Sequence, residues 1–429
     1  MTVAQAETST LSPKRLLAAT RPANFVRVDT LLTQQELAIQ ARVREFVDER
    51  VIPIMAGRWD AAEFPFELVP ELARLGVPGG SIQGYGCSGW SSVAYGLALQ
   101  EIARGAGSLA TFLHVQSGLA MTVIHELGSE EQKELWLPAL ARCEKVGCFA
   151  LTEPDVGSDA ASIATTARRD GAEYVLQGRK RWIGNASFAD IAIICARGED
   201  DKVGVFLVEG DNPGYHAEPI LQKGSQRAVV QAEIELCDCR IPESNRLPGG
   251  RGLGSILSCL TESRFGVAWD GLGQALDCYE IALAYALERR QFGQPLAGFQ
   301  LVQHKLVTMI TELSEAQLLS IHIGRLKDAG RLEPGQVSML KMSNLTKARQ
   351  VAALAREVLG GNGILLDYRI MEHMADIEGA YTYEGANDIN MLIVGQAITG
   401  HKAFAAAPSG QQSRISQIEE TSAKDRTGD

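Results

Sequence analysis

Residues 230–236 read VQAEIEL, and their strict alternation of apolar and polar side chains decides how the middle of the chain folds. Successive side chains of a β-strand point to opposite faces, so this alternation predicts a strand with one buried face. Short apolar runs bounded by glycine and aspartate predict further strands at 174–176, 191–195 and 203–208. The segment from about 148 to 242 is therefore expected to form a small sheet domain.

Helical patterns flank this sheet on both sides. Thr33 and Glu36 form a capping box that opens a helix, which Pro53 is expected to close. Two more helical segments are predicted at 95–102 and 109–127, separated by the glycine-rich stretch 105–107. After Gly254 the helical period returns, with long segments predicted near 256–290, 300–329, 337–359 and 367–402. The sequence therefore predicts an N-terminal helical region, then a sheet, then a C-terminal helical region.

Length and composition describe a globular protein of several packed units. The 429 residues exceed the roughly 250–300 at which single cores stop growing. The formal charge of −11 leaves no basic surplus for a nucleic acid or an anionic membrane surface. No run approaches the length of apolar residues that a membrane span needs, so none is predicted.

Cysteine and histidine spacing predicts no metal site. The 8 cysteines include one close pair, Cys237 and Cys239, which is too tightly spaced for a metal or redox CxxC motif. Reduced structural thiols are expected. We divide the chain into a flexible leader (1–28), an N-terminal helical domain (29–147), a middle β domain (148–250), a C-terminal helical bundle (251–405) and a disordered tail (406–429). The Thr-, Ala- and Ser-rich leader with few acids fits a transit peptide and a bacterial leader equally well.

The tripeptide Tyr383-Glu384-Gly385 holds the best candidate for a catalytic base. An aromatic neighbour excludes water, and a glycine lets a ligand approach the backbone closely. Burial of this kind lifts a glutamate pKa toward the range useful for general-base catalysis at neutral pH. A solvated turn is the ordinary alternative for the tripeptide taken alone, because glutamate is usually exposed.

Five motifs in order give this turn its context. They are Phe149 to Asp159 (FALTEPDVGSD), Arg181 to Asn185 (RWIGN), Arg289 to Gly293 (RRQFG), Gly360 to Gly363 (GGNG) and Tyr383-Glu384-Gly385. In this order and spacing, from about residue 30 to 405, the chain resembles the acyl-CoA dehydrogenases, and most of all the branch of glutaryl-CoA dehydrogenases and short-chain acyl-CoA oxidases. The resemblance implies an N-terminal all-α domain, a barrel-like middle β-sheet domain and a C-terminal four-helix bundle, with FAD, a homotetramer, and α,β-dehydrogenation of an acyl-CoA thioester.

The resemblance also assigns roles to residues. Glu384 matches the catalytic base. The matched FAD-binding positions are Phe149, Leu151, Thr152, Ser158, Trp182, Ile183, Gly184, Arg289, Phe292, Gln300, Glu357, Gly360, Gly361, Ala386, Asp388 and Phe404. The matched substrate-binding positions are Ala110, Thr111, Ser158, Arg264 and Gly385. In the family the matching arginine at 289 and the glycine turn at 360 reach FAD across a subunit boundary, whereas taken alone they are a surface arginine and a helix C-cap.

A thioester α-proton is too weak an acid for a raised glutamate pKa alone to remove it. Donors to the thioester oxygen, each worth about 3 kcal/mol in comparable sites, must supply part of the difference. In this family those donors are the base's own backbone amide and a flavin hydroxyl. Some relatives place the base just before the arginine that matches Arg264, and Ser263 stands there in this chain, although Glu262 lies one residue away.

Three departures from the family pattern bear on substrate and acceptor. Ala110 and Thr111 replace the Arg-Ser pair that holds the distal carboxylate in glutaryl-CoA dehydrogenases, which disfavours glutaryl-CoA and favours a short or medium saturated acyl group in an apolar pocket that includes Leu109, Phe112 and Leu113. Gly184 stands where dehydrogenases usually have threonine and related plant oxidases have glycine, which keeps dioxygen open as the acceptor. Ala386 replaces a common threonine.

The alternatives are an acyl-CoA oxidase, a glutaryl-CoA dehydrogenase, a non-catalytic acyl-CoA-binding relative and a flavin monooxygenase of the same fold. The expected partners are an acyl-CoA, an electron-transfer flavoprotein or dioxygen, and further copies of the chain. A bacterial protein of this kind would be cytoplasmic, and a eukaryotic one would fit the mitochondrial matrix.

Overall fold

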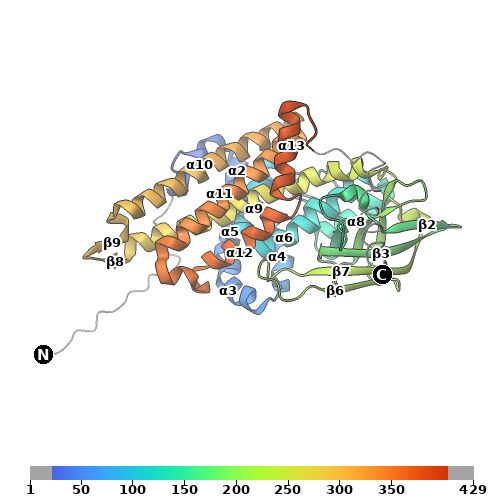
Figure 1. The fold of residues 1–429 in the computed structure, drawn as a ribbon, viewed down its shortest axis with the longest axis horizontal. Helices are drawn as coiled ribbons and strands as arrows, with labels where there is room; N and C mark the ends of the chain where they lie inside the picture. The colour runs from blue at the N-terminus through green and yellow to red at the C-terminus, as the bar shows by residue number, and fades with distance from the viewer. Residues whose placement is uncertain (1–21, 404–429) are drawn as a thin grey trace, which may run out of the picture.

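The computed structural model describes residues 22–403; helices precede and follow a sheet in the chain, and the sheet lies at one end of the molecule (Figure 1). Predictions that fall on 1–21 and 404–429, including the role given to Phe404, lie outside the described residues. The N-terminal region is built from α2 (Gln34–Phe46), α3 (Ile52–Ala61), α4 (Val69–Leu75), α5 (Ser92–Gly105), α6 (Gly107–Leu113), α7 (Thr122–Leu127) and α8 (Glu130–Ala141).

The predicted capping box at the start of α2 is confirmed. Glu36 N donates to Thr33 Oγ1 and Thr33 N donates to the Glu36 carboxylate. The predicted end at Pro53 is wrong, because α2 passes at Phe46 into the π-helical segment Val47–Val51 and then into α3. Pro53 lies in the first turn of α3, where its missing N–H costs no hydrogen bond.

The middle of the chain forms the predicted sheet. Its strands are β1 (Gly147–Ala150), β2 (Thr166–Asp170), β3 (Glu173–Gly184), β4 (Ile191–Arg197), β5 (Val203–Glu209), β6 (Tyr215–Pro219) and β7 (Gln231–Pro242), in the order β1-β4-β2-β3-β7-β6 with β5 paired to β4. The alternation that predicted β7 is confirmed, since Ala232, Ile234 and Leu236 are buried and pack in the sheet's own core. β3 and β7 pair over most of their length and carry Trp182 and its neighbours at one end of the pair.

Long helices form the C-terminal region. They are α9 (Leu253–Glu288), α10 (Gln300–Asp328) and α11 (Pro334–Leu359), followed by the shorter α12 (Ile370–Thr382) and α13 (Asn387–Thr399). The small strands β8 (Arg290–Gln291) and β9 (Gln294–Pro295) join α9 to α10 at the end of the bundle opposite the sheet (Figure 1). The single helix predicted over 367–402 is wrong in one respect, because residues 383–386 break it, and Glu384 lies in that break.

The helices from Gly107 to Leu127 run through the centre of the molecule. This stretch is long and apolar enough to cross a membrane by length and composition, but 94% of its apolar window is buried inside the protein, as in a core helix. All 8 cysteines are free thiols. Beside this core, buried Arg104 joins the N-terminal and C-terminal helices by ion pairs to Asp48 and Glu101 and by longer contacts to Asp277 and Glu280.

Candidate active site

Glu384 lies in a strained turn between α12 and α13. Its backbone φ is +55° and that of Gly385 is +84°, so two consecutive residues adopt the left-handed region. That conformation costs a glutamate of order 1 kcal/mol, and it persists only where surrounding contacts hold it. Strain of this kind at a carboxylate points to a functional residue.

Buried donors hold every carbonyl of the turn. Lys341 Nζ donates to Tyr383 O and Gly385 O at 2.5 and 2.7 Å, and Arg264 Nε donates to Glu384 O at 3.1 Å. Asn390 Nδ2 donates to Gly385 O and Ala386 O at 2.7 and 3.3 Å. Among the described residues, the Glu384 backbone N–H has no acceptor. The turn therefore leaves one N–H and one carboxylate for a ligand.

The surroundings of Glu384 raise the pKa of its carboxyl group. Burial raises it most, while the charges of Arg264, Lys341 and His114 lower it in turn. The buried Ser263 hydroxyl lowers this pKa slightly from beyond normal hydrogen-bond distance, since it has no bonded partner among the described residues. Glu384 is thus a stronger proton acceptor than an exposed glutamate.

Glu262, the other carboxylate considered for the base, is engaged elsewhere. Its two oxygens bind Lys327 Nζ at 2.8 Å and Ser81 Oγ at 3.1 Å. Ser263 occupies the position that some relatives use for the base, and it packs beside Gly118. Glu384 is therefore the carboxylate that the described residues leave unpaired in this region.

A buried polar network extends from Tyr383 toward α6. Tyr383 OH lies 3.1 Å from Thr111 Oγ1 and 3.3 Å from Asp270 Oδ2. Thr111 Oγ1 also contacts Gln226 Oε1 at 2.7 Å, and the Gln226 backbone N–H donates to Asp376 Oδ1 at 2.6 Å. The environment of Thr111 thus consists of neutral hydrogen-bonding groups backed by two buried carboxyl groups.

The predicted pocket wall on α6 is only partly as expected. Leu109, Ala110, Phe112 and Leu113 are fully buried and belong to the main hydrophobic core. Thr111 is the residue of this helix that reaches Tyr383. Thr111 was predicted as a substrate position, and the structure adds that its hydroxyl contacts Tyr383 and Gln226.

A second group of predicted residues gathers where the segment after β1 meets β3. Arg181 N donates to Thr152 O, which brings the 149–158 segment next to Trp182. Trp182 has a φ of +64°, and its ring is 54% exposed. Phe149, Leu151 and Ile183 are buried behind it, while Ser158 is exposed. An exposed indole held in a strained conformation suits stacking on a flat ring.

Gly184 lies in a closely packed position. A Cβ built there would come within 2.7 Å of Val115 Cγ2. The space that a threonine side chain would take is therefore filled by Val115. This packing weighs against an open path for dioxygen beside Gly184.

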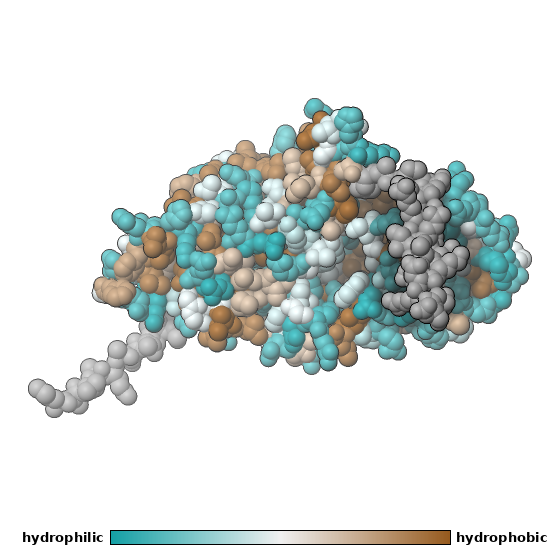
Figure 2. All heavy atoms as spheres, in the orientation of Figure 1, coloured by the Kyte–Doolittle hydropathy of each residue, from teal (hydrophilic) through white to brown (hydrophobic). Residues whose placement is uncertain are grey.

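The remaining predicted cofactor residues lie at the opposite end of the bundle (Figure 1). Arg289 caps the end of α9, Phe292 is 95% exposed with φ +48°, and Gln300 begins α10. Glu357 binds Lys305 at 2.7 Å just before the exposed turn that contains Gly360 and Gly361. Other apolar side chains are exposed here, namely Leu287, Leu301, Ile364 and Leu365, and brown atoms mark this end in Figure 2.

The length of α9 separates the Glu384 turn from Arg289. Arg264, beside Glu384, and Arg289 are 25 residues apart in one continuous helix. At a rise of 1.5 Å per residue this spacing is about 37 Å, more than one dinucleotide can bridge. The Glu384 turn and Arg289 therefore lie far apart along α9.

The last predicted residues lie around the start of α13. Ala386 is its N-cap and offers no side-chain cap, while Asp388 is exposed in the first turn. Sequence reasoning missed Lys341, His114 and Asn390, which surround the turn. A signal existed for Lys341, because it falls on the buried stripe of α11 at helical spacing from Val337 and Leu345.

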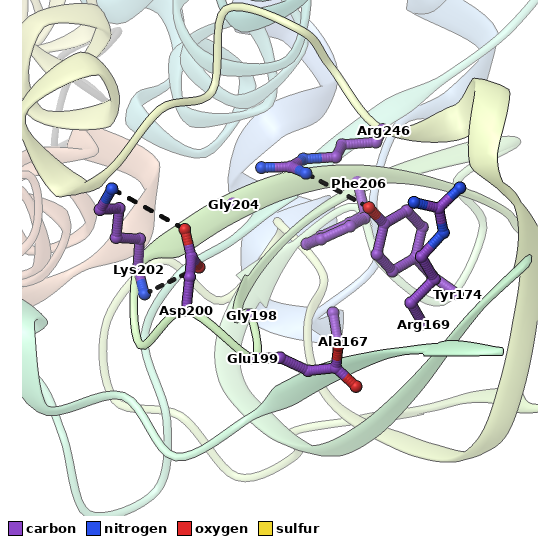
Figure 3. A pocket seen from close by; sticks show the side chains of 10 residues that line it. All are labelled: Ala167, Arg169, Tyr174, Gly198, Glu199, Asp200, Lys202, Gly204, Phe206 and Arg246. Atoms are coloured by element: carbon purple, nitrogen blue, oxygen red, sulfur yellow. Dashed lines mark hydrogen bonds and ion pairs between the residues drawn. The ribbon is translucent and has the colours of Figure 1, made fainter.

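A shallow pocket lies elsewhere, on the sheet domain (Figure 3). Arg246 Nη1 donates to Tyr174 OH there at 3.2 Å, and Arg169 also lines the wall. None of the predicted site residues lines this pocket. The predicted site residues therefore lie away from this pocket.

Comparison with known proteins identifies the family. Its profiles match in chain order: "Acyl-CoA dehydrogenase, N-terminal domain" at residues 33–144, "middle domain" at 148–239 and "C-terminal domain" at 250–399. The chain belongs to the acyl-CoA dehydrogenase family. The three-domain fold implied by the resemblance is thereby confirmed, and the protein is an oxidoreductase of a family that acts on CH–CH bonds of acyl-CoA.

Similar proteins include both curated relatives and solved structures. A benzylmalonyl-CoA dehydrogenase of Aromatoleum aromaticum is 34% identical over 87% of this chain and 100% of its own length. A glutaryl-CoA dehydrogenase of Mycobacterium smegmatis is 45% identical, covers 90% of this chain and 100% of its own, and superposes with a TM-score of 0.88. The butyryl-CoA dehydrogenase of Megasphaera elsdenii is 29% identical over 86% of this chain and 98% of its own, with a TM-score of 0.82.

The cofactor of this acyl-CoA dehydrogenase is FAD, which the family uses. A structure of the Mycobacterium smegmatis glutaryl-CoA dehydrogenase, 44% identical, contains FADH2. The residues present here fit that cofactor. Trp182 offers an exposed side chain beside the backbone at Thr152, and the exposed Arg289 offers a cation at the end of the helical bundle opposite the sheet.

Proposed function

We propose that this enzyme introduces an α,β double bond into a short- or medium-chain acyl-CoA with an uncharged acyl tail, and that Glu384 is its base. The observation that carries the proposal is the Glu384 turn, in which a half-buried carboxylate of raised pKa stands beside an unused backbone N–H. The α-C–H bond breaks and its proton goes to the Glu384 carboxylate. Bound FAD supplies the acceptor for the hydride that leaves the β-carbon as the C=C bond forms.

The chain's own groups account for the acidity that proton removal needs. The Glu384 N–H is placed to donate to the thioester oxygen, where a donor of this kind is worth about 3 kcal/mol. The strained turn holds carboxylate and N–H in one fixed relation, because its carbonyls are bound to buried donors. Next to Glu384, the Tyr383 side chain is anchored by the contact of its hydroxyl with Thr111 of α6.

The network around Thr111 supports an uncharged acyl tail. The groups in direct contact with Thr111 Oγ1 are neutral, and the next groups beyond Tyr383 and Gln226 are the carboxyl groups of Asp270 and Asp376. A distal carboxylate placed here would meet no cation in contact with Thr111 and would lose several kcal/mol of hydration.

Glutaryl-CoA is the second candidate substrate. The 45% identity to a glutaryl-CoA dehydrogenase favours it. The absence of a basic residue at Ala110 and Thr111 opposes it, and we rank it below a neutral acyl-CoA for that reason. A benzylmalonyl-CoA dehydrogenase among the relatives keeps larger acyl groups in the test panel.

We also propose an electron-transfer flavoprotein as the acceptor and a homotetramer as the assembly. The filled position beside Gly184 favours a protein acceptor over dioxygen. Arg289 lies about 37 Å along α9 from Arg264 beside Glu384, and this spacing favours a site completed by a second subunit. The exposed apolar residues around Phe292 provide a surface for that contact.

The test is anaerobic bleaching of the FAD-loaded enzyme by butyryl-, octanoyl-, benzylmalonyl- and glutaryl-CoA. We expect butyryl- and octanoyl-CoA to bleach the flavin, and glutaryl- and benzylmalonyl-CoA, each of which carries a free carboxylate, to bleach it more slowly. Glu384→Gln should keep its yellow FAD and lose bleaching by at least 10³-fold, since the amide cannot accept the proton. Full bleaching by this variant would contradict the role of Glu384, and faster bleaching by glutaryl-CoA would contradict the substrate. Admission of air afterwards distinguishes slow reoxidation, expected for a dehydrogenase, from the fast reoxidation of an oxidase.

A further inference from the structure

Lys341 is a buried cation whose contacts need an explanation. Its side chain is fully buried on α11, and its ammonium group donates to two backbone carbonyls, Tyr383 O and Gly385 O. Within residues 22–403 it makes no ion pair within 4.0 Å. A neutral amide could bind two carbonyls without the cost of burying a charge. The charge itself must therefore serve a purpose.

The carboxylates that neighbouring helices present to α11 are bound by other cations. Glu312 and Glu315 of α10 bind Lys347, and Glu378 of α12 binds Arg349. The charged groups that act on Lys341 are Glu384 and, from α9, Arg264. The anion that balances Lys341 is thus the carboxylate of Glu384.

The turn geometry gives Lys341 a second purpose. The two carbonyls that it binds belong to the residues on either side of Glu384, and both Glu384 and Gly385 have positive φ. One ammonium group bridging these carbonyls holds the chain in the left-handed turn. Without the bridge, Glu384 would lose a support that offsets its backbone strain.

We propose that Lys341 is the positioning residue of the catalytic base: it bridges the carbonyls on both sides of Glu384 and sets the charge opposite its carboxylate. This inference rests on the proposed function of Glu384. It assigns two separable contributions to one side chain, a hydrogen-bonded bridge that fixes the turn and a positive charge that favours the ionised carboxylate.

The positive charge of Lys341 depends on pH, and it is fully present only below neutral pH. Burial lowers the pKa of Lys341 to about 7, while the charge of Glu384 raises it and that of Arg264 lowers it. Lys341 in turn lowers the pKa of Glu384, which also faces Arg264 and His114. Removing the Lys341 charge should therefore move the pKa of the base upward and leave less of it ionised below neutral pH.

Two substitutions separate the contributions. Lys341→Met removes both bridge and charge, whereas Lys341→Gln keeps an amide that can donate to the carbonyls but carries no charge. Lys347→Met, on the same helix and paired to Glu312 and Glu315, is the matched control. FAD content and the thermal unfolding midpoint report whether each variant is folded.

The first readout is the rate of anaerobic flavin bleaching against pH, with the full-length FAD-loaded enzyme and its best acyl-CoA. For Lys341→Met we expect a loss of about 10²-fold at neutral pH, the size of effect that a misplacement of about 1 Å produces, with the acyl-CoA Kd changed by less than threefold. Lys341→Gln should recover part of the rate, and both variants should show the acid limb of the profile displaced to higher pH. Lys347→Met should match the wild type.

The second readout does not use the redox reaction. Exchange of the α-hydrogens of acetyl-CoA, which has no β-carbon to oxidise, is followed by mass spectrometry in D2O. It should be slowed in Lys341→Met and in Glu384→Gln. A Lys341→Met enzyme with wild-type rate and pH profile, beside an inactive Glu384→Gln, would overturn the role of Lys341 alone, and normal activity of both variants would overturn the proposed base as well. If Lys341→Met does not fold, an unshifted profile in Lys341→Gln overturns the proposal.

Discussion

Glu372 on α12 offers a pH-dependent test of the fold itself. Its carboxyl group is fully buried, and neither oxygen has a hydrogen-bond partner among the described residues. Burial, then the nearby Asp376, raises its pKa from 4.5 to about 8, against the lowering effect of Arg369. At neutral pH the folded protein therefore keeps this carboxyl protonated, whereas the unfolded chain ionises it.

The sign and size of the effect follow from that difference. The unfolded chain releases the proton from about pH 4.5 upward and the folded one only from about pH 8, so folding stability falls as pH rises between these values. Each pKa unit is worth about 1.4 kcal/mol, so the loss reaches about 3 kcal/mol at pH 7 and levels off above pH 8. Glu372→Gln has the same shape and no proton to lose. It should match the wild type near pH 4.5 and exceed it by about 3 kcal/mol at pH 7.

The assay is urea unfolding of wild type and Glu372→Gln at pH 5, 7 and 8.5, followed by tryptophan fluorescence at matched FAD content. Glu378→Gln is the control, because Glu378 lies on the same helix, is half exposed and pairs with Arg349 at 2.7 Å. Its removal should cost under about 1 kcal/mol with no such trend. A difference between Glu372→Gln and wild type that stays constant from pH 5 to 8.5 would refute the reasoning.

Two further predictions concern the sheet end of the site. Trp182→Ala should lose bound FAD on dilution, measured by flavin absorbance after gel filtration. Its unfolding midpoint without FAD should stay near that of the wild type, because Trp182 is 54% exposed. Leu135→Ala, at a residue of α8 that is 66% exposed, should keep FAD, and equal retention by both variants would count against Trp182. Val115→Ala should speed reoxidation of the bleached flavin in air, because it vacates the space beside Gly184; an unchanged rate of peroxide formation would show that this packing does not limit dioxygen.

The sequence predicted the elements whose pattern is local. The Thr33 capping box and the β7 alternation are properties of a few consecutive side chains, and both are confirmed. Pro53 was misinterpreted because proline ends a helix in its interior but is tolerated in a first turn, and the π-helical segment before it starts a new helix. The apolar period of the sequence does not tell whether a proline falls in the interior of a helix or in the first turn of a new one.

The candidate site was predicted only where a motif carried it. The break at 383–386 was missed because residues on both sides keep a helical apolar period, whereas the positive φ of Glu384 is imposed by donors from α9 and α11. Those donors come from residues 43 to 120 positions away in the chain, so no window of sequence contains them. Arg104 and its buried acids were missed for the same reason.

The position of Trp182 on the sheet and of Arg289 at the far end of the helical bundle has a genetic consequence. In the oligomer that we propose, each flavin would be held by Trp182 of one subunit and Arg289 of another, so a lesion at one end of a chain disables its neighbour's site. Two inactive alleles, one altered at each end, could then complement each other in a mixed assembly, since some sites would receive two intact halves. A single altered allele would by itself disable only its own share of the sites, because each altered residue serves one site.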